Sequence, residues 1–328
     1  MSVFTPVTVE EVQRFLADYA LGEVEALEGI EAGVENTNYF LDTTTGRYVL
    51  TLFEKLGVQE LPFYLRLMEY LAENGFNGPR PQPRYVNDAS GGLENERHKD
   101  LFGILNGKPA SICTRLPGAP RMEPTLDDCF NVGRLLAQLH EIGIDFDMGM
   151  DNWRGQPWRE AFAAKAAGKL TAQENALIAS ENAFQAAIDP TEIPQGIIHG
   201  DLFRDNVLWD DAGVPGVIDF YFACDDCLLY DIAIAANDFC VRDDASLDPQ
   251  RSAMLIAGYE DVRELEPNER ALWSAMLRRA ALRTWLGRIG YVHFPQDGEM
   301  THAKDHGFTE RLLRHHIAHA GAPSHRLD

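Results

Sequence analysis

At 328 residues the chain exceeds the roughly 250–300 residues at which one hydrophobic core stops growing, so we expect two lobes around a cleft. Hydrophobic residues make up 45% of the sequence and charged residues 24%, which is typical of a soluble globular protein and excludes a fibrous or disordered one. The net charge of −22 argues against nucleic acid or an anionic membrane as partner, because both require basic patches, and a polyanionic ligand would need metal ions to neutralise it.

The N-terminal segment, MSVFTPVTVEEVQRF, has no basic region followed by a long apolar run, and no stretch approaches the ~20 apolar residues of a membrane span. The five cysteines are few and odd in number, which is typical of reduced thiols. Cys224 and Cys227 form a single CxxC without a second pair, so we expect them to be structural. These features predict a cytoplasmic protein, and they do not distinguish a monomer from a homodimer.

The first third of the chain predicts three strands, one helix and two further strands. Thr8 and Glu11 have capping-box spacing at the start of a short N-terminal helix. β-Branched and aromatic residues then predict a three-stranded meander within residues 29–53. Helical spacing follows in PFYLRLMEYLAEN, residues 62–74, and the Asn-Gly pair at 106–107 predicts a hairpin between the last two strands.

The segment RLPGAP, residues 115–120, contains two prolines and a glycine and predicts a linker. We therefore expect an N-terminal lobe over residues 1–114 and a C-terminal lobe over residues 115–328. The second lobe is predicted to be mainly helical, with one β-rich segment at residues 197–220. Its helices are expected at residues 125–142, 158–187, 230–241, 248–259, 267–290 and 309–320.

The β-rich segment, IIHGDLFRDNVLWDDAGVPGVIDF, places polar residues at the ends of short apolar runs. Residues 200–206 form a polar loop, after which the chain turns at DDAG and returns as a strand that ends at Asp219. This hairpin brings the Asp219 carboxylate beside the Asn206 amide, and hard oxygen ligands of this kind suit Mg²⁺. Asp201, at the other end of the loop, is placed to accept the proton of a substrate hydroxyl.

Each of these residues has a simpler interpretation on its own, because Asp and Asn often form surface turns. Asp205 and Asp210 need no role beyond a turn or a solvent contact. Asp201, Asn206 and Asp219 together favour a catalytic site, because they have HGDxxxxN spacing on a hairpin that ends in IDF.

The segments HGDLFRDN and VIDFYFACDDCLLYDIA resemble the catalytic and metal-binding segments of the aminoglycoside phosphotransferase and choline kinase superfamily, which is related to the protein kinases. The resemblance implies an α+β, bilobal, protein-kinase-like fold: an N-terminal five-stranded antiparallel sheet plus helix, and a mainly helical C-terminal lobe with a catalytic β-hairpin. It implies that Asp201 is the catalytic base and that Asn206 and Asp219 bind the metal. Asp231 would be a structural acid, and His199 would orient the loop.

The resemblance also implies ATP and Mg²⁺ as cofactors and makes the N-terminal lobe the nucleotide-binding lobe. The segment GIEAGVENTNYFL takes the place of the family's phosphate loop. Its implied phosphate-binding residues are Asn36, Thr37 and Asn38. At the linker, Thr114 and Leu116 bound the backbone that would face the adenine edge.

One position departs from the family pattern. Members usually carry Lys or Arg two residues after the position of Val49, to pair the α- and β-phosphates, but Thr51 stands there. Lys55 is either a replacement on the same strand face or a solvated lysine at the strand end. Its helix partner, such as Glu69, is equally open.

Four further segments, EAGVENTNYFLDTT, RYVLTLFEK, ELPFYLRLMEYLAENG and GKPASICTRLPG, resemble the bacterial homoserine kinases that adopt this fold. That resemblance implies a small-molecule amino-acid substrate: L-homoserine, phosphorylated to O-phospho-L-homoserine in threonine biosynthesis. The alternatives are other small-molecule kinases of the superfamily, acting on choline, ethanolamine, methylthioribose or an aminoglycoside, and a nucleotide-binding module without catalysis.

A zwitterionic acceptor needs a cation for its carboxylate and an acid or carbonyl group for its ammonium. By family analogy, the candidates in the second lobe are Arg204, Arg283, Trp285 and Arg288. The alternative for these arginines is a charged helix face. His302 with His306, and His315 with His319, have the helical spacing of a zinc site, but without a nearby acid and cysteine set an exposed helix is favoured.

Overall fold

The computed structural model describes residues 4–30, 36–87, 97–294, 306–322 and 325–327. The chain divides into two compact units, the first ending at Pro117 and the second beginning at Gly118. Each unit has a hydrophobic core of its own. Among the helices of the described ranges, none combines the length and the apolar character that a membrane crossing requires.

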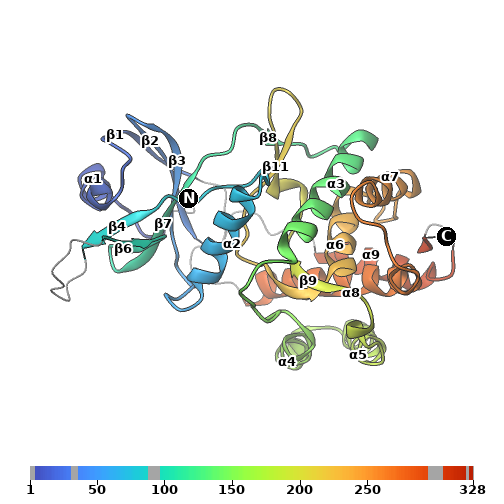
Figure 1. The fold of residues 1–328 in the computed structure, drawn as a ribbon. Helices are drawn as coiled ribbons and strands as arrows, with labels where there is room; N and C mark the ends of the chain where they lie inside the picture. Colours follow the sequence, from blue (N-terminus) through green and yellow to red (C-terminus); the bar gives the residue numbers. More distant parts are fainter. Residues whose placement is uncertain (1–3, 31–35, 88–96, 295–305, 323–324, 328) are drawn as a thin grey trace. The chain divides into compact units, whose positions relative to one another are not determined.

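The first unit is built on a five-stranded antiparallel sheet with the strand order β1-β2-β3-β7-β6 (Figure 1), which confirms the predicted sheet. Its strands are β1 (Val24–Gly29), β2 (Thr37–Thr43), β3 (Gly46–Leu52), β6 (Gly103–Leu105) and β7 (Lys108–Thr114). Leu41, Leu50 and Ile112 come from neighbouring strands and are buried in a core shared with α1 (Val9–Phe15). The predicted helix after β3 is α2 (Leu61–Glu73).

A second hairpin in this unit was not predicted. β4 (Arg84–Asn87) pairs with β5 (Arg97–Asp100) in a separate two-stranded antiparallel sheet. Their sequences, RYVN and RHKD, are mostly polar, so the alternation of apolar and polar residues that marks a half-buried strand is missing.

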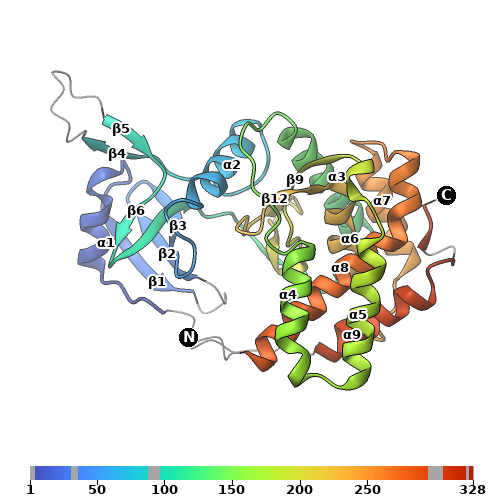
Figure 2. The same ribbon diagram turned by 90° about the horizontal axis from the view of Figure 1, so that it is seen from below.

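The second unit is mainly helical, as predicted. Its helices are α3 (Leu126–Gly143), α4 (Gln156–Ala166), α5 (Ala172–Ala186), α6 (Leu228–Phe239), α7 (Pro249–Glu260), α8 (Pro267–His293) and α9 (His306–Ala318). α8 packs against α6 and α9, α3 packs against α7, and α4 and α5 lie side by side (Figure 2). The single helix predicted at 158–187 is two helices, because Leu170 is extended and Thr171 begins α5 with a capping box.

Two small sheets in this unit hold the candidate site. β10 (Val207–Trp209) and β11 (Pro215–Val217) form the predicted hairpin, which β8 (Ala119–Pro120) extends. β9 (Gln195–Ile198) pairs with β12 (Cys224–Cys227). The loop from β9 to β10 and the segment from β11 to β12 therefore both run between the same two sheets, and this brings the two connections together.

The cysteines play a structural part. All five are buried and none forms a disulfide. Burial raises the pKa of the Cys227 thiol to about 12 and also raises that of Cys224, so neither is a reactive thiolate near neutral pH. The CxxC pair belongs to β12 and its packing.

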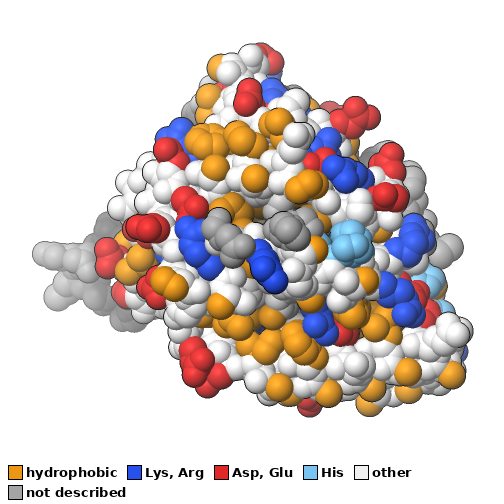
Figure 3. Space-filling model, turned by 90° about the vertical axis from the view of Figure 1, so that its right-hand side faces the viewer, with side chains coloured by type: hydrophobic (Ala, Val, Ile, Leu, Met, Phe, Trp, Pro, Cys, Tyr) orange, Lys and Arg blue, Asp and Glu red, His pale blue; other side chains and the backbone are white. Residues whose placement is uncertain are grey.

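The distribution of basic side chains on one face of the protein agrees with the acidic composition. On the face shown in Figure 3, Lys and Arg side chains are scattered among acidic and apolar side chains instead of gathering in one patch. A nucleic acid would need such a patch to displace its counterions. This face does not provide one.

Candidate active site

The hairpin places Asn206 and Asp219 at the same end of its two strands. Val207 pairs with Val217, and the N–H of Ile218 donates to the carbonyl oxygen of Asn206 over 3.0 Å. Asp219 follows directly with a φ of +64°, a conformation that is uncommon for residues with a side chain but that Asp adopts more readily than most. The structure therefore brings the backbone of Asn206 next to the residue that precedes Asp219, so both residues lie at one end of the hairpin.

Asp201 is held from two sides at the other end of the loop. The Arg283 guanidinium donates to its Oδ1 over 2.8 Å. On the other side, Asn206 Nδ2 donates to the Asp201 carbonyl oxygen over 2.9 Å and lies 3.5 Å from Oδ2. Because Asn206 uses its amide nitrogen for this contact, its amide oxygen is directed elsewhere and is the end that suits a cation.

His199 couples the loop to the strand that leads into Asp219. Its ring is fully buried, with Nε2 at 3.0 Å from the Ile218 carbonyl oxygen and Nδ1 accepting the Asp201 N–H over 3.3 Å. A carbonyl oxygen can only accept, so Nε2 carries the proton. Burial lowers the pKa of His199, which keeps the ring neutral. His199 therefore orients the loop, as the family resemblance implies.

Asp231, in the first turn of α6, fixes the backbone of the loop. Its Oδ2 accepts the N–H of His199 over 2.6 Å, and its Oδ1 accepts the N–H of Gly200 over 2.9 Å. Oδ2 also lies 3.2 Å from Nε2 of His140. Burial alone would raise the pKa of Asp231, but the hydrogen bonds from the His140 ring and from the His199 backbone lower it, so the carboxylate stays charged.

Gly200 is required by the close approach of two chain segments. Its φ is +72°, and a Cβ at this position would lie 2.6 Å from the carbonyl oxygen of Phe222. That separation is far inside van der Waals contact. Only glycine therefore fits between His199 and Asp201 without displacing the segment that follows Asp219.

Two of the four residues predicted to bind the acceptor hold the loop. Arg283, on α8, is buried and donates to the Gly200 carbonyl oxygen over 2.9 Å as well as to the Asp201 carboxylate. Burial would lower the pKa of Arg283, but the charge of Asp201 raises it above its ordinary value. Arg204 donates to the Asp238 carboxylate over 2.9 Å and so ties the loop to α6.

The other two predicted acceptor residues lie further along α8. Trp285 is fully buried in the hydrophobic core of the second unit and has no surface to offer a ligand, which corrects the prediction that it contacts the acceptor. Arg288 is half-buried. Burial lowers the pKa of Arg288, and the charges of Asp205 and Asp201 oppose that effect. The Arg288 guanidinium therefore lies near the loop that carries these two carboxylates.

The residues predicted to bind phosphate lie in the first unit. Thr37 is fully buried, and its hydroxyl donates to Glu54 Oε1 over 2.8 Å while accepting the N–H of Phe4. This side chain holds the N-terminal segment, so the predicted phosphate contact of Thr37 is left to its backbone. Asn38 and Thr51 are paired across β2 and β3, and the Thr51 hydroxyl donates to Asn38 Oδ1 over 2.8 Å.

The remaining predicted nucleotide contacts are also in this unit. Asn36 directly precedes β2, and Val49 is a half-buried residue of β3. The N–H of Thr114 donates to the Arg80 carbonyl oxygen over 2.9 Å. Any adenine contact must therefore come from the other backbone groups of the segment that ends at Leu116.

The structure describes both Lys55, the candidate for the missing phosphate-binding lysine, and Glu69, its candidate helix partner. β3 ends at Leu52, so Lys55 lies beyond the strand, which excludes one of the two alternatives, a lysine on the strand face. Glu69 of α2 pairs with Lys99 of β5, with Nζ and Oε1 2.6 Å apart. The sequence did not predict this pairing, because β5 itself was not predicted.

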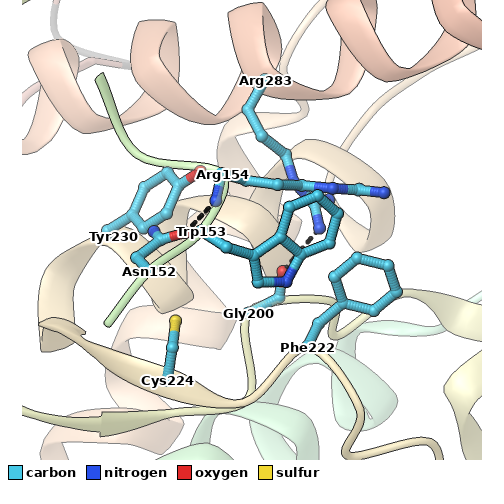
Figure 4. A pocket seen from close by; sticks show the side chains of 8 residues that line it. All are labelled: Asn152, Trp153, Arg154, Gly200, Phe222, Cys224, Tyr230 and Arg283. Carbon is cyan, nitrogen blue, oxygen red and sulfur yellow. Dashed lines mark hydrogen bonds between the residues drawn. The ribbon is translucent and has the colours of Figure 1, made fainter. Parts of the chain in front are cut away.

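A pocket lies next to Gly200 within the second unit (Figure 4). It is lined by Asn152, Trp153, Arg154, Gly200, Phe222, Cys224, Tyr230 and Arg283. Arg283 joins the pocket to Asp201, because the same guanidinium donates to that carboxylate. Residues 152–154 were missed from sequence, since DNWRG carries no motif and its one signal is a tryptophan beside an arginine.

The oxygen donors at the hairpin end fit a magnesium ion. The Asn206 amide oxygen and the Asp219 carboxylate are hard ligands of the kind that Mg²⁺ prefers. Within the described ranges, no three His, Cys, Asp or Glu side chains form a metal cluster of their own. Mg²⁺ usually takes one or two protein carboxylates together with substrate phosphates, so two residues suit an ion that arrives with a nucleotide.

Comparisons with known proteins agree with this geometry. The phosphotransferase enzyme family matches residues 26–265, a range that includes the Asp201 loop and the hairpin. The homoserine kinase of Methylobacillus flagellatus is 47% identical over 318 residues, which cover 97% of this chain and 96% of that protein. The homoserine kinase of Polaromonas naphthalenivorans is 41% identical over 324 residues, covering 97% of this chain and 99% of that protein.

The fold is shared with a solved kinase. An amicoumacin kinase, solved in complex with AMP-PNP, Ca²⁺ and Ami, matches with a TM-score of 0.68 over 97% of this chain and 95% of that chain. The two sequences are 13% identical, so the likeness concerns the fold alone. It confirms the predicted protein-kinase-like class.

Proposed function

Because the chain belongs to the phosphotransferase enzyme family, we propose that it transfers the γ-phosphoryl group of ATP to the side-chain hydroxyl of L-homoserine, giving O-phospho-L-homoserine and ADP. Homoserine kinases match the chain over nearly its whole length, and this reaction is a step of threonine biosynthesis. The observation that carries the proposal is the Asp201 loop, where a carboxylate is held by the Arg283 guanidinium and lies beside the Asn206 amide.

Asp201 accepts the proton of the acceptor hydroxyl. Its Oδ1 is held by Arg283, whereas among the described residues Oδ2 is approached by the distant Asn206 nitrogen at 3.5 Å, so Oδ2 is the oxygen that suits a hydroxyl. Phosphoryl transfer depends mainly on positioning and electrostatic stabilisation. Arg283, His199 and Asp231 supply the positioning, because together they fix the backbone and one carboxylate oxygen of the loop.

Asn206 and Asp219 hold Mg²⁺ that is bound to the nucleotide. When bound, the ion neutralises phosphate charge that a protein with a net charge of −22 would otherwise repel. The hairpin supports this role, because the hydrogen bond from Ile218 to Asn206 aligns the two strand ends from which the oxygen donors project.

The first unit binds ATP. We assign the phosphates to the backbone of residues 36–38, and the adenine to backbone groups of residues 114–116. Val49 and Thr51 belong to β3 of the same sheet, and Thr51 acts through Asn38, whose amide oxygen it binds.

The proposal includes a cytoplasmic location and a small-molecule partner. The acidic composition supports a small acceptor over nucleic acid. Either a monomer or a homodimer is compatible with the proposal.

Asp201→Asn tests the proposal. Removing a general base should lower kcat by about 10²–10⁴-fold and leave ATP affinity nearly unchanged, because Asp201 acts on the acceptor hydroxyl. ADP release with saturating homoserine measures the first quantity, and a nucleotide titration measures the second. A variant that phosphorylates homoserine at a near-normal rate would refute the base assignment.

Asp210→Asn is the matched control for this experiment. Asp210 lies in the turn between β10 and β11, where its Oδ1 accepts the N–H groups of Ala212 and Val214. The substitution removes the same charge from the same hairpin without touching the loop, so activity should stay near normal. A loss equal to that of Asp201→Asn would mean that activity depends on the negative charge of this part of the chain and not on Asp201 as a general base.

A further inference from the structure

A second pocket lies within the second unit, between α4, α5 and α8, three helices that pack against one another (Figure 2). Its volume is about 150 Å³. Among the described residues, it shares no lining residue with the pocket beside Gly200, so it is a separate site. Its polar lining comes from Arg159, Arg279, Gln156 and Gln185, and its apolar lining includes Ile188 and Met276.

Arg159, on α4, is buried in this pocket with two unpaired nitrogen atoms. The residue is 3% exposed, and among the described residues no hydrogen-bond partner meets its Nε or its Nη1. Burial lowers the pKa of Arg159, and the charge of Arg279 lowers it further. The opposing charges of Asp226 and Glu160 do not outweigh these effects. A buried charge is costly without a counter-charge, so the site is suited to an anionic ligand group.

Arg279, on α8, also lines the pocket but has a counter-charge within the protein. Its guanidinium pairs with Asp226 Oδ2 over 2.6 Å. Burial would lower the pKa of Arg279, but the charge of Asp226 raises it above its ordinary value. Its Nε has no hydrogen-bond partner in the part of the chain that the structure describes. The two arginines therefore bring two positive charges against one paired carboxylate, and both keep N–H donors for a ligand.

Two acidic side chains of the surrounding helices are engaged elsewhere. Glu181 of α5 accepts from Nε of Arg278 over 3.0 Å. Glu160 of α4 is exposed and accepts from Nε2 of Gln156 over 2.8 Å. The excess positive charge at Arg159 is therefore left for a ligand.

The charges of the pocket favour a ligand with one negative charge. A carboxylate would balance Arg159, whereas a phosphate dianion would replace an excess positive charge by an excess negative one. The two oxygens of a carboxylate also suit the N–H donors of a planar guanidinium. Gln156 is the first residue of α4, so the positive end of that helix dipole lies beside the pocket.

The apolar lining and the volume limit the rest of the ligand. Ile188 and Met276 provide apolar surface, which suits an aliphatic chain. A cavity of about 150 Å³ is large enough for a benzene molecule, so the ligand has only a few carbon atoms. Gln156 is exposed, and solvent therefore reaches this side of the pocket.

We propose that this pocket binds a small aliphatic monocarboxylate. The carboxylate oxygens accept from the unpaired nitrogens of Arg159 and from Nε of Arg279, and the aliphatic chain packs against Ile188 and Met276. The proposal does not depend on the phosphorylation of homoserine, because the site is separate from the pocket beside Gly200.

Equilibrium dialysis of the full chain with radiolabelled butyrate, at constant ionic strength, tests the proposal. We expect butyramide, which has a similar shape without the charge, to compete at least about 10-fold more weakly than unlabelled butyrate. Arg159→Met should lower the affinity for butyrate by about 10- to 100-fold, because charge-assisted hydrogen bonds are lost. Arg134→Met is the matched control, because Arg134 pairs with Asp261 and lies outside the pocket, so the affinity should not change.

Three results would overturn the proposal. The first is a wild type that does not bind butyrate. The second is equal competition by butyramide and butyrate, which would show that the charge plays no part. The third is an Arg159→Met variant that binds butyrate as well as the wild type does.

Gln156→Glu tests the same site without removing a buried side chain. The new carboxylate would lie beside the pocket on the exposed first turn of α4 and repel the ligand, so the affinity for butyrate should fall by about 10-fold. Gln250→Glu is the matched control, because it adds the same charge to the exposed first turn of α7.

Thermal unfolding without butyrate checks the fold of each variant, and Gln156→Glu decides if Arg159→Met does not fold. A loss of affinity in Gln156→Glu but not in Gln250→Glu supports the site. Equal losses in the two variants, or no loss in either, would overturn it.

Discussion

Arg283 shows how a buried charge in the core of the second unit serves the catalytic loop. Its guanidinium is almost completely removed from water, and the Asp201 carboxylate and the Gly200 carbonyl oxygen compensate it. A buried pair of this kind contributes less to net stability than to a defined geometry. The orientation of Asp201 is the property that phosphoryl transfer needs.

Histidines near the C-terminal end form a second buried polar group. His316 is fully buried, with Nδ1 at 2.9 Å from His325 Nε2 and its own Nε2 at 2.8 Å from Asn237 Oδ1. Burial lowers the pKa of His325 to about 4, with a further contribution from His315 and His319, and burial keeps the pKa of His316 well below its ordinary value. Both rings are therefore neutral in the folded protein near neutral pH.

This group predicts how stability depends on pH. In the unfolded chain both histidines titrate near their ordinary pKa of about 6.5. Below that pH the unfolded state binds more protons than the folded state, so the free energy of unfolding should fall as the pH drops from about 7 to about 5. The slope should reach up to about 1.4 kcal/mol per pH unit for each histidine.

Urea titrations across this pH range measure the slope. His325→Gln removes one of the two groups and should make the slope shallower. A wild-type stability that does not change between about pH 7 and pH 5, or an unchanged slope in the variant, would contradict the assignment.

At the scale of residues, a site residue could be predicted where the residues that it contacts are close to it in the sequence. The contact of Asn206 with Asp201, and the place of Asp219 at the same end of the hairpin as Asn206, could be predicted because these residues are close in the sequence or joined by one short hairpin. Arg154 could not, because its guanidinium contacts Phe222 and its neighbour Asn152 binds Asp226 of β12, both far along the chain. Trp285 was misplaced because α8 has apolar residues on several faces, so the pattern does not show which of them enter the core.

At the scale of elements, the contact between α3 and α7 supports the catalytic loop indirectly, through residues that these two helices carry. A Cβ at Gly258 of α7 would lie 1.9 Å from the carbonyl oxygen of Phe130 on α3, so the helix backbones touch there. The same helices contribute His140 and Tyr259, whose ring nitrogen and hydroxyl are 2.7 Å apart. His140 in turn binds Asp231, which holds the loop.

Gly258→Ala should therefore destabilise the protein. The added methyl group forces α7 away from α3, and overpacking of this kind costs about 1–3 kcal/mol or more. Urea unfolding measures the change. The bond between His140 and Tyr259 should lengthen, so kcat should fall as well.

Gly287→Ala is the matched control, because Gly287 lies within α8 and an added Cβ would meet nothing within 4 Å. It should stabilise the protein by about 0.5–1 kcal/mol, as alanine does in a helix interior. If Gly258→Ala is as stable as the wild type, the backbones of α3 and α7 do not touch at Gly258.

The types of the elements followed from periodicity, but some of their limits did not. The helix predicted at residues 158–187 has a break at Leu170 and Thr171. The run of helix-forming residues does not show this break, whereas the capping box at Thr171 does. The β4–β5 hairpin has no apolar alternation and was not predicted. Both cases are decided by local caps and tertiary packing, which periodicity alone does not report.

At the scale of the whole molecule, overall charge and local charge have opposite signs. The chain carries a net charge of −22, yet the pocket beside Gly200 contains two arginines. The overall charge is negative, whereas the pocket gathers positive side chains beside the catalytic loop. Net charge argued against a nucleic acid as partner but could not indicate the acceptor, which depends on which side chains the fold gathers.

The most direct test of the central claim is the rate of ADP release with homoserine, choline, ethanolamine, methylthioribose and an aminoglycoside, each with ATP and Mg²⁺. We expect kcat/KM for homoserine to exceed that for every other acceptor by at least about 10²-fold, because a site built for a carboxylate rejects acceptors that lack one. Preference for an acceptor without a carboxylate, or ADP release with none of them, would contradict the account.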